Sequence, residues 1–340
     1  MQIWSTSTSA GEHPLFWKSY LIRYWNKEVR NTTNAIPNFL LSKASPLSAA
    51  DSASFSKLAA QNALSFHLPA FCASANLLCF PDLGTRGRCN GWRDLGNGTY
   101  EYFQNNNQGK NNGSTATGDS VKKMAEPGTF FRVSMLKKGE VMAMPEIKDN
   151  RPERSFLPRT ILSKLPLSTL EVKKFFRVED NSTMGARIVK SLSGCETAPN
   201  QGEIKRCVGS AEDMIDFAVL VLGRNVAVRS TENANGSKQN IMIGSVKVIN
   251  SMQQAVSCHQ NLFPYLLYYC HSSPKVQVYE VDMLDLNSKA KINHGVAICH
   301  MNTSAWSPSH EAFLALGSGP GRIEVCHWIY ENDLTWTVAN

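Results

Sequence analysis

The sequence lacks several features that would assign it to a protein class at once. It contains no run of about 18 apolar residues, so we expect no helix that spans a membrane. The first residues, Met1 to Trp17, are rich in Ser and Thr and have no basic region followed by an apolar one, so no signal peptide is visible. No zinc finger, RNP-type aromatic strand or basic zipper is present, and we therefore expect no nucleic-acid partner.

Excess charge of one sign is also scarce, apart from one segment. The 340 residues have a formal net charge of +7. Residues 121–190 contain 15 Lys and Arg against 8 Asp and Glu, whereas the rest of the chain contains 20 of each sign. This segment predicts either an ordinary solvated surface or a site for a polyanion, such as nucleic acid, acidic lipid or pectin.

Nine cysteines and eight histidines are the most informative part of the composition. Cys72 lies close to Cys79 in the sequence, and Cys195 lies close to Cys207, which suits disulfides in an oxidising compartment. Chance gives roughly four Asn-x-Ser/Thr sequons in such a chain, so the six that occur agree with secretion without establishing it. These candidate glycosylation sites are Asn31, Asn97, Asn112, Asn181, Asn235 and Asn302.

Two segments precede the main domain. Residues 1–95 form a first unit, which we expect to be small and helical. Within it, Leu47 to Leu64 have helical spacing with Ala, Phe and Leu on one side, and Asp51 suits the N-cap. Residues 96–126 form a low-complexity linker. Its run from Asn105 to Asp119 has almost nothing to bury, which predicts a disordered or extended segment.

Residues 127–340 form the main domain. Ser210 caps a predicted helix that Gly223 ends, and Glu212 and Asp213 favour its first turn. The second half contains short segments rich in Val, Ile and Tyr, separated by Ser, Asn, Pro and Gly, as strands are. We therefore predict an α+β fold whose C-terminal domain is a mostly antiparallel sheet with a few helices. The predicted strands are Val226–Thr231, Ile241–Val248, Tyr265–His271, Val276–Met283, His294–Met301, Ile323–Tyr330 and Leu334–Val338.

The dipeptide Cys-His occurs four times in this domain. Random placement of the same cysteines and histidines would give it roughly 0.2 times, so the pattern is a strong signal. Successive pairs are separated by 10, 27 and 25 residues, and eight residues lie between the last pair and Trp336. The pairs are Cys258-His259, Cys270-His271, Cys299-His300 and Cys326-His327.

The direct adjacency of Cys and His predicts that the two residue types have different roles. Neighbouring side chains of a strand point to opposite faces, so four cysteines would face one side and four histidines the other. Four facing thiols in an oxidising compartment would form two disulfides. Four converging neutral imidazoles would form a site for a transition metal, and copper binds tightest among the divalent ions. The predicted ligands are His259, His271, His300 and His327.

Two other arrangements stay open. Cys and His could share one metal ion, as in zinc sites, although directly adjacent ligands do not easily chelate one ion. Alternatively, the cysteines could form a disulfide core beside histidines that bind nothing. His294 and His310 lie in the same region and are either additional ligands or ordinary histidines.

At these residues the sequence resembles the BURP domain of plants. The spacing from Cys258 to Trp336, written CH-x10-CH-x27-CH-x25-CH-x8-W, is typical of that family. The resemblance covers roughly residues 127–340. Further family-like features are Phe130-Phe131, Cys195-Glu196 and Cys207.

The N-terminal unit resembles one group within this family, that of the polygalacturonase non-catalytic beta subunit. That group typically has a signal peptide and Phe-x-x-Tyr repeats before the BURP domain, and neither occurs in this sequence. The stretch Thr85 to Trp92 also departs from the pattern and leaves Cys89 as the odd thiol. The resemblance rests on Leu21–Lys27, Lys43–Leu47, Phe71–Cys79, Phe156–Thr160 and Gly223–Val226.

The resemblance implies a secreted, non-enzymatic glycoprotein of the apoplast. It would associate with polygalacturonase or pectin and influence wall loosening and cell size, and the basic segment suits a polyuronide partner. The sequence contains none of the short motifs typical of a pectin hydrolase. A glycosidase needs two suitably placed carboxylates, and we interpret the nearest candidates, Asp282 and Asp285, as solvated charges at a strand end.

Two other functions are open. Some BURP proteins resemble copper-dependent enzymes that crosslink a Tyr or Trp side chain into a cyclic peptide, which implies a copper cofactor on the four histidines. Trp92, Tyr100 and Tyr102 are conceivable targets within this chain. The third function is structural, that of a disulfide-stapled wall protein. The cysteines that could form its disulfides are Cys72, Cys79, Cys195, Cys207, Cys258, Cys270, Cys299 and Cys326.

Overall fold

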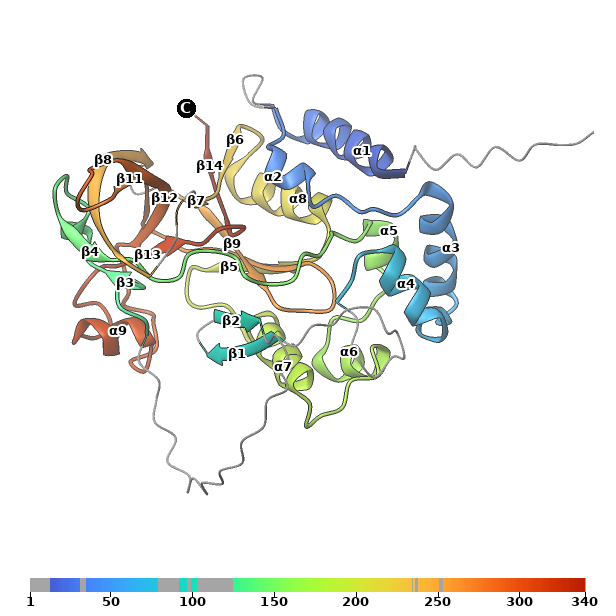
Figure 1. Ribbon diagram of the computed structural model, residues 1–340. Coiled ribbons are helices and arrows are strands. Elements are labelled where there is room, and N and C mark those ends of the chain that lie inside the picture. The colour runs from blue at the N-terminus through green and yellow to red at the C-terminus, as the bar shows by residue number, and fades with distance from the viewer. Residues whose placement is uncertain are drawn as a thin grey trace, which may run out of the picture.

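Two antiparallel sheets and a set of N-terminal and central helices form the molecule (Figure 1). The computed structural model describes residues 13–30, 35–78, 92–96, 99–102, 125–233, 235, 238–250 and 253–339. Every strand pair in these residues is antiparallel, which confirms the predicted α+β fold. No helix in these ranges is long and apolar enough to cross a membrane.

The first sheet has five strands in the order β5-β10-β9-β14-β6. Its strands are β5 (Ile204–Val208), β6 (Val226–Arg229), β9 (Val256–Asn261), β10 (Leu267–Ser272) and β14 (Leu334–Val338).

The second sheet has seven strands in the order β3-β13-β12-β11-β8-β4, with β7 paired to β12. Its strands are β3 (Phe130–Phe131), β4 (Val141–Ala143), β7 (Glu232–Asn233), β8 (Asn240–Asn250), β11 (Val276–Leu284), β12 (Lys291–His300) and β13 (Val325–Ile329). A separate hairpin pairs β1 (Trp92–Gly96) with β2 (Thr99–Tyr102).

Helices from the N-terminus and the centre of the chain cover the first sheet. The N-terminal helices are α1 (His13–Glu28), α2 (Asn38–Leu41), α3 (Ala49–Ala60), η1 (Leu64–His67) and α4 (Leu68–Ser74). The later helices are α5 (Arg159–Leu162), α6 (Thr169–Phe175), α7 (Thr183–Glu196) and α8 (Ala211–Leu222). Two further helices, η3 (Val133–Met135) and α9 (Glu311–Leu316), pack instead against β3 and β13 of the second sheet.

The best-predicted helix is α8. Ser210 accepts a hydrogen bond from the Asp213 amide, and Gly223 follows the last turn with φ +80°, a conformation that glycine adopts without strain. The predicted cap of α3 was wrong. Ser48 is the N-cap and accepts from the amide of Asp51, which lies in the first turn.

Two apolar clusters join the N-terminal helices to the residues after 125. In the first, Trp25 of α1 packs against Trp336 of β14 with ring centroids 5.9 Å apart, together with Phe217 of α8. In the second, Phe71 of α4 belongs to the same cluster as Phe263. Segments far apart in sequence therefore share cores. The predicted linker falls mostly outside the described residues.

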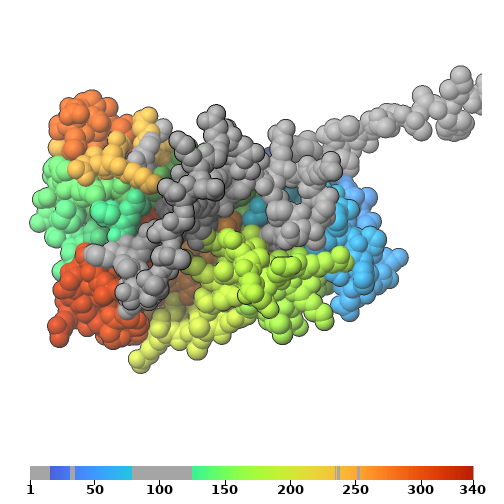
Figure 2. Space-filling view, turned by 60° about the horizontal axis from the view of Figure 1, so that its bottom comes forward, coloured from blue at the N-terminus to red at the C-terminus, as the bar shows by residue number. Residues whose placement is uncertain are grey.

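The basic segment is partly neutralised within the fold. Arg132 pairs with Glu324 at 2.7 Å and Lys173 with Asp180 at 3.1 Å. Arg151, Arg159 and their acidic partners form further pairs at 2.6 to 2.8 Å. Figure 2 shows the later part of this segment (yellow-green) between the N-terminal helices (blue) and the C-terminal residues (red), and its first part (green) beside the C-terminal residues. The number of Lys and Arg residues in this segment therefore overestimates the positive charge that is free at its surface.

Candidate metal centre

Two disulfides cross neighbouring strands beside the histidines. Cys258 of β9 lies opposite Cys270 of β10, and Cys299 of β12 lies opposite Cys326 of β13; the Cα–Cα distance is 3.9 Å in both disulfides. All four cysteines are fully buried. The sequence predicted two disulfides among these residues but left their connectivity open.

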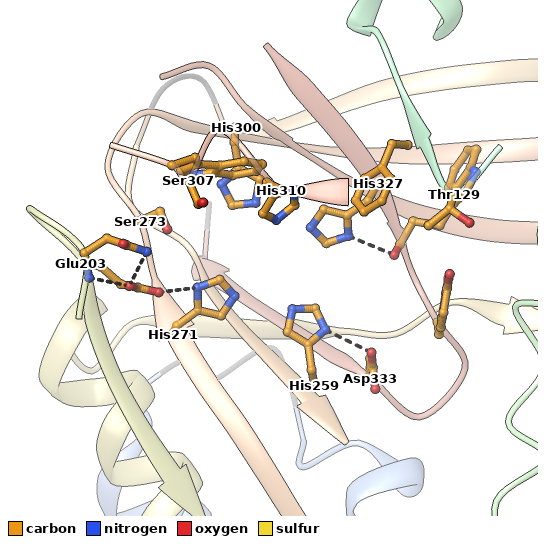
Figure 3. Close-up of a pocket in the computed structure, with 15 residues that line it drawn as sticks. Thr129, Glu203, His259, His271, Ser273, His300, Ser307, His310, His327 and Asp333 are labelled. Carbon is orange, nitrogen blue, oxygen red and sulfur yellow. Dashed lines mark hydrogen bonds and ion pairs between the residues drawn. The ribbon is translucent and has the colours of Figure 1, made fainter. Parts of the chain in front are cut away.

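Strand alternation places the histidines on the faces opposite these disulfides. In each strand pair the two histidines lie diagonally, because His259 is opposite Tyr269 and His327 is opposite Ile298. Diagonal neighbours on one face of a sheet lie about 7–8 Å apart and remain within reach of one another. Figure 3 shows His259 and His271 from the first sheet facing His300 and His327 from the second.

These four residues, which we call the histidine quartet, form a closed ring of contacts. Their ring centroids are separated by 5.4 Å for His259–His271 and 6.4 Å for His271–His300. The remaining sides measure 5.5 Å for His300–His327 and 5.8 Å for His259–His327. The four predicted ligands therefore come together from both sheets.

Hydrogen-bond acceptors that do not belong to the histidine quartet orient three of its four imidazoles. Nδ1 of His259 lies 3.0 Å from Asp333, and Nδ1 of His271 lies 3.1 Å from Glu203. Nδ1 of His327 lies 3.1 Å from the carbonyl oxygen of Trp328. A carboxylate or carbonyl oxygen only accepts, so each Nδ1 carries the proton and each Nε2 keeps its lone pair. Metal-binding histidines are oriented in this way.

The fourth histidine differs. His300 is 4% exposed, and its Nδ1 has no hydrogen-bond partner among the described residues. Its ring packs edge-on against Trp306 with centroids 5.0 Å apart. A buried polar atom without a partner is uncommon and is often explained by an ion or water that completes its bonds. The donor set therefore fits a metal.

Burial favours the neutral form of these rings. Burial and the neighbouring His327 hold the pKa of His300 well below its usual value. Burial and the neighbouring His259 lower the pKa of His327 to about 4. Burial also lowers the pKa of His271, although Glu203 partly offsets this. Neutral imidazole is the form that binds metals, so these rings are in the binding form at neutral pH.

The rings are not yet close enough to share one ion. Four imidazoles bound tetrahedrally at about 2.0 Å place their centroids about 5 Å apart. The shortest side of the quartet, at 5.4 Å, is close to that value, and the longest, at 6.4 Å, must shorten by about 1 Å. Accordingly, no group of three or more His, Cys, Asp or Glu side chains in the described ranges has the geometry of a finished metal site.

A pocket of about 460 Å³ adjoins the quartet. Glu203 and Asp333 line it beside the histidines of the first sheet, and aromatic residues line it as well. Its volume lies within the range of small-molecule and cofactor sites. The aromatic lining residues are Phe130, Trp306, Trp328 and Tyr330.

The two additional histidines have different positions. His310 lines the pocket and stacks on Trp306 at 4.5 Å, but its Nδ1 accepts from the Ala312 amide as the N-cap of α9. His294 lies outside the pocket lining and contacts Asp282 at 3.1 Å. Of the two, only His310 is placed to face a ligand.

Asp282 and Asp285 have structural contacts. Lys291, at 2.7 Å, and His294 hold the pKa of Asp282 below its usual value. Asp285 accepts from the amides of Asn287 and Ser288 at 3.0 and 2.8 Å and so caps a turn. Neither carboxylate lines the pocket.

The other predicted sites are only partly described. Cys195 forms a third disulfide with Cys207, with a Cα–Cα distance of 5.7 Å. Cys72 is buried, whereas Cys79 and Cys89 lie outside the described residues. Among the sequons, Asn181, Asn235 and Asn302 are exposed; Asn31, Asn97 and Asn112 lie outside the described residues.

Sequence reasoning missed the acceptors Glu203 and Asp333 and the aromatic residues that line the pocket. Glu203 is 68 positions from the histidine it contacts, and no spacing rule predicts such a pair. Asp333 offered a weak signal, because it follows the last Cys-His pair by only a few residues in the turn before β14.

Comparison with known proteins agrees with the resemblance to the BURP domain. The model of the BURP domain family matches residues 129–338. Polygalacturonase 1 beta-like protein 3 of Arabidopsis thaliana is 63% identical over 228 residues, which are 66% of this chain and 36% of that protein. Polygalacturonase-1 non-catalytic subunit beta of Solanum lycopersicum is 66% identical over 220 residues, which are 63% of this chain and 35% of that protein.

A third relative matches along almost its whole length. BURP domain-containing protein 16 of Oryza sativa subsp. japonica is 42% identical over 336 residues, which are 96% of this chain and 91% of that protein. The alignments with the polygalacturonase-named relatives, in contrast, span little more than a third of those proteins.

Proposed function

This chain belongs to the BURP domain family, and we propose that it is a secreted, non-enzymatic cell-wall protein that associates with polygalacturonase or with pectin. Through that association it would influence wall loosening and cell size. The observation behind the proposal is the identity of 63–66% to relatives that are named as polygalacturonase beta-like proteins or non-catalytic subunits.

The carboxylates in the pocket support a function other than pectin hydrolysis. A glycosidase needs one carboxylic acid that stays protonated to act as general acid. Burial raises the pKa of Glu203, but hydrogen bonds from His271 and Asn200 outweigh it and lower that pKa to about 2. Glu203 is therefore ionised at neutral and mildly acidic pH, which does not suit a general acid.

The test is binding of the secreted, folded chain to immobilised polygalacturonate and to a purified polygalacturonase. We expect retention that weakens with salt, since polyanion contacts are screened. Failure to bind either partner at low ionic strength would contradict the proposal. Lys137 and Lys138 are exposed and make no ion pair among the described residues, so Lys137→Glu/Lys138→Glu should reduce retention on the polyuronide. Lys275→Glu/Lys289→Glu makes the same charge change outside the basic segment and is the matched control.

The quartet and its pocket favour a second candidate, a copper-dependent enzyme that crosslinks Tyr or Trp side chains. His259, His271, His300 and His327 would hold the metal, which would supply one-electron chemistry when bound. The aromatic residues that line the pocket suit an aromatic side chain, and Trp92, Tyr100 and Tyr102 lie on β1 and β2.

Metal analysis and mass spectrometry separate the candidates. Bound copper, with loss of two hydrogens from a peptide that contains Tyr or Trp, would favour crosslinking; an external oxidant must accept those hydrogens. Polygalacturonate binding without any crosslink would favour the accessory function. A chain that binds neither metal nor wall components but melts lower under reduction would favour the structural, disulfide-stapled protein.

A further inference from the structure

We propose that the Cys195–Cys207 disulfide is a positioning element of the histidine quartet, although neither cysteine belongs to a Cys-His pair. The disulfide fixes the loop between α7 and β5, this loop fixes Glu203, and Glu203 fixes the ring of His271. The part of this proposal that concerns metal affinity rests on the quartet's being a metal site. The part that concerns the ring of His271 does not.

Glu203 has no freedom to turn away from His271. One carboxylate oxygen accepts from Nδ1 of His271 at 3.1 Å and from the Tyr269 hydroxyl at 3.2 Å. The other accepts from the backbone amide and the side-chain amide of Asn200 at 2.9 and 3.1 Å. The side chain of Glu203 is only 7% exposed. The proton on Nδ1 of His271 therefore has one fixed acceptor, and Nε2 faces the pocket.

The disulfide ties both ends of the loop that contains Glu203. Cys195 lies in the last turn of α7, and Cys207 lies twelve positions later in β5. In the described residues β5 is an edge strand that pairs only with β10, and the disulfide adds a covalent cross-link to α7 besides the loop itself. Lys205 adds hydrogen bonds from its Nζ to the Gly194 carbonyl at 2.7 Å and to Thr197 at 3.1 Å.

Strand register passes this constraint to the histidine. Cys207 lies opposite Tyr269, and Lys205 lies opposite His271. Gly194 of α7 packs directly on the Tyr269 ring, where an added Cβ would lie 3.2 Å away. The ring of Tyr269 in turn stacks on His271 at 5.1 Å. The α7–β5 unit thus contacts His271 through both a hydrogen bond and a stacked ring.

His259 provides an internal control, because different residues hold it. Its acceptor, Asp333, lies in the turn before β14 and also accepts from the Gln260 amide at 2.8 Å. Changes in the α7–β5 loop should leave that arrangement intact. The proposal therefore predicts that such changes affect the ring of His271 alone, whereas general destabilisation would affect both His271 and His259.

The first test uses metal-free protein with 15N-labelled histidine at about pH 8, above the usual histidine pKa. Ring-nitrogen NMR should show the Nδ1–H tautomer for both His259 and His271 in the wild type. Glu203→Ala and Cys195→Ser/Cys207→Ser should move His271 toward the Nε2–H tautomer and leave His259 unchanged. An unchanged His271 signal in the folded Glu203→Ala protein would overturn the proposal, even where the disulfide variant does not fold.

The second test is titration of the same proteins with Cu(II). Loss of an acceptor that orients a metal-binding histidine weakens metal binding by about 10–100-fold, which we expect for Glu203→Ala. For the disulfide variant we expect about 3–10-fold, since its loop loosens but Glu203 remains. Glu203→Gln keeps one oxygen that can accept from His271 and should lie between Glu203→Ala and wild type. If copper binding is absent in wild type, the proposed metal site fails while the tautomer result still decides the positioning role. If wild type binds copper and the folded disulfide variant binds it equally tightly, the disulfide does not position the metal site.

Discussion

His300 is the single residue that best tests the quartet as a metal site. It is buried, its Nδ1 is unpartnered among the described residues, and it closes the ring between His271 and His327. We expect His300→Ala to abolish metal binding, measured as metal per protein after dialysis. His294→Ala is the control, because His294 lies outside the pocket lining. Equal metal content in wild type and His300→Ala would refute the assignment.

The buried rings also predict how stability depends on pH. The pKa of His327 is lowered to about 4 in the folded state and is near 6.5 when unfolded, so the unfolded state binds more protons in between. The contribution of His327 to the free energy of unfolding is constant above about pH 6.5. It falls as the pH drops from there and levels off below about pH 4. From His327 alone we expect a loss of about 1–2 kcal/mol between pH 7 and pH 5. Lowered pKa values of His271 and His300 act in the same direction.

Urea unfolding of metal-free protein at several pH values measures this effect. The lowered pKa of Glu203 reduces stability only when the pH falls below the usual pKa range of carboxylates. The change in stability between pH 7 and pH 5 therefore reports mainly the histidines. His327→Asn should flatten the dependence in that interval. A midpoint that does not change between pH 7 and pH 5 would show that these rings titrate normally.

At the residue scale, the sequence predicted that the four histidines converge, but it did not predict the residues that hold them. Directly adjacent Cys and His must point to opposite faces of any strand, so His259 and Cys258 could be separated without a structure. The partners Glu203 and Asp333 depend on how a loop and a turn pack against the sheet. That packing has no local sequence signal, since the contacts join residues 68 and 74 positions apart.

At the scale of elements, the two cross-strand disulfides should stabilise the sheets to different extents. Cys258–Cys270 closes a separation of 12 residues and Cys299–Cys326 closes one of 27. Removing a native disulfide typically costs about 2–5 kcal/mol, and chain entropy adds about 0.7 kcal/mol for the longer loop. We therefore expect Cys258→Ser/Cys270→Ser to lower the free energy of unfolding by about 2–5 kcal/mol, and Cys299→Ser/Cys326→Ser by slightly more.

Chemical unfolding of each double variant, with and without reductant, measures these differences. Reductant should destabilise the wild type more than either variant, because the wild type has more disulfides to lose. Identical unfolding of oxidised and reduced wild type would show that the disulfides contribute nothing to stability.

Strands were predicted correctly where their composition is typical of strands. Segments rich in Val, Ile and Tyr, such as β11 and β14, were predicted within about one residue of their ends. The strand β9 was missed because its sequence, Val-Ser-Cys-His-Gln-Asn, has only one β-branched aliphatic residue. Its neighbours on both sides, β10 and β14, hold it in the sheet, so tertiary context overrides its weak propensity.

At the scale of the whole molecule, sequence patterns did not predict how the units pack. Local spacing predicted a helix over Leu47–Leu64 within a first unit that was expected to be helical, but helical spacing does not identify the surface that a helix covers. In the structure, α1 packs on α8 and β14, and Trp336, which closes the Cys-His spacing pattern, is the residue that Trp25 contacts. The family-defining tryptophan therefore belongs to a core that the N-terminal helices complete.

This shared core predicts that a change in α1 destabilises the domain that contains the quartet. Trp25 is 1% exposed, so Trp25→Ala should lower the free energy of unfolding by about 3–5 kcal/mol. Fluorescence and far-UV circular dichroism should report one coincident unfolding transition at lower urea concentration. Phe66→Ala is the control, since Phe66 is 75% exposed and its loss should cost less than about 0.5 kcal/mol. Two separate transitions, with the sheets unfolding as in wild type, would show that the N-terminal helices fold independently of the BURP domain.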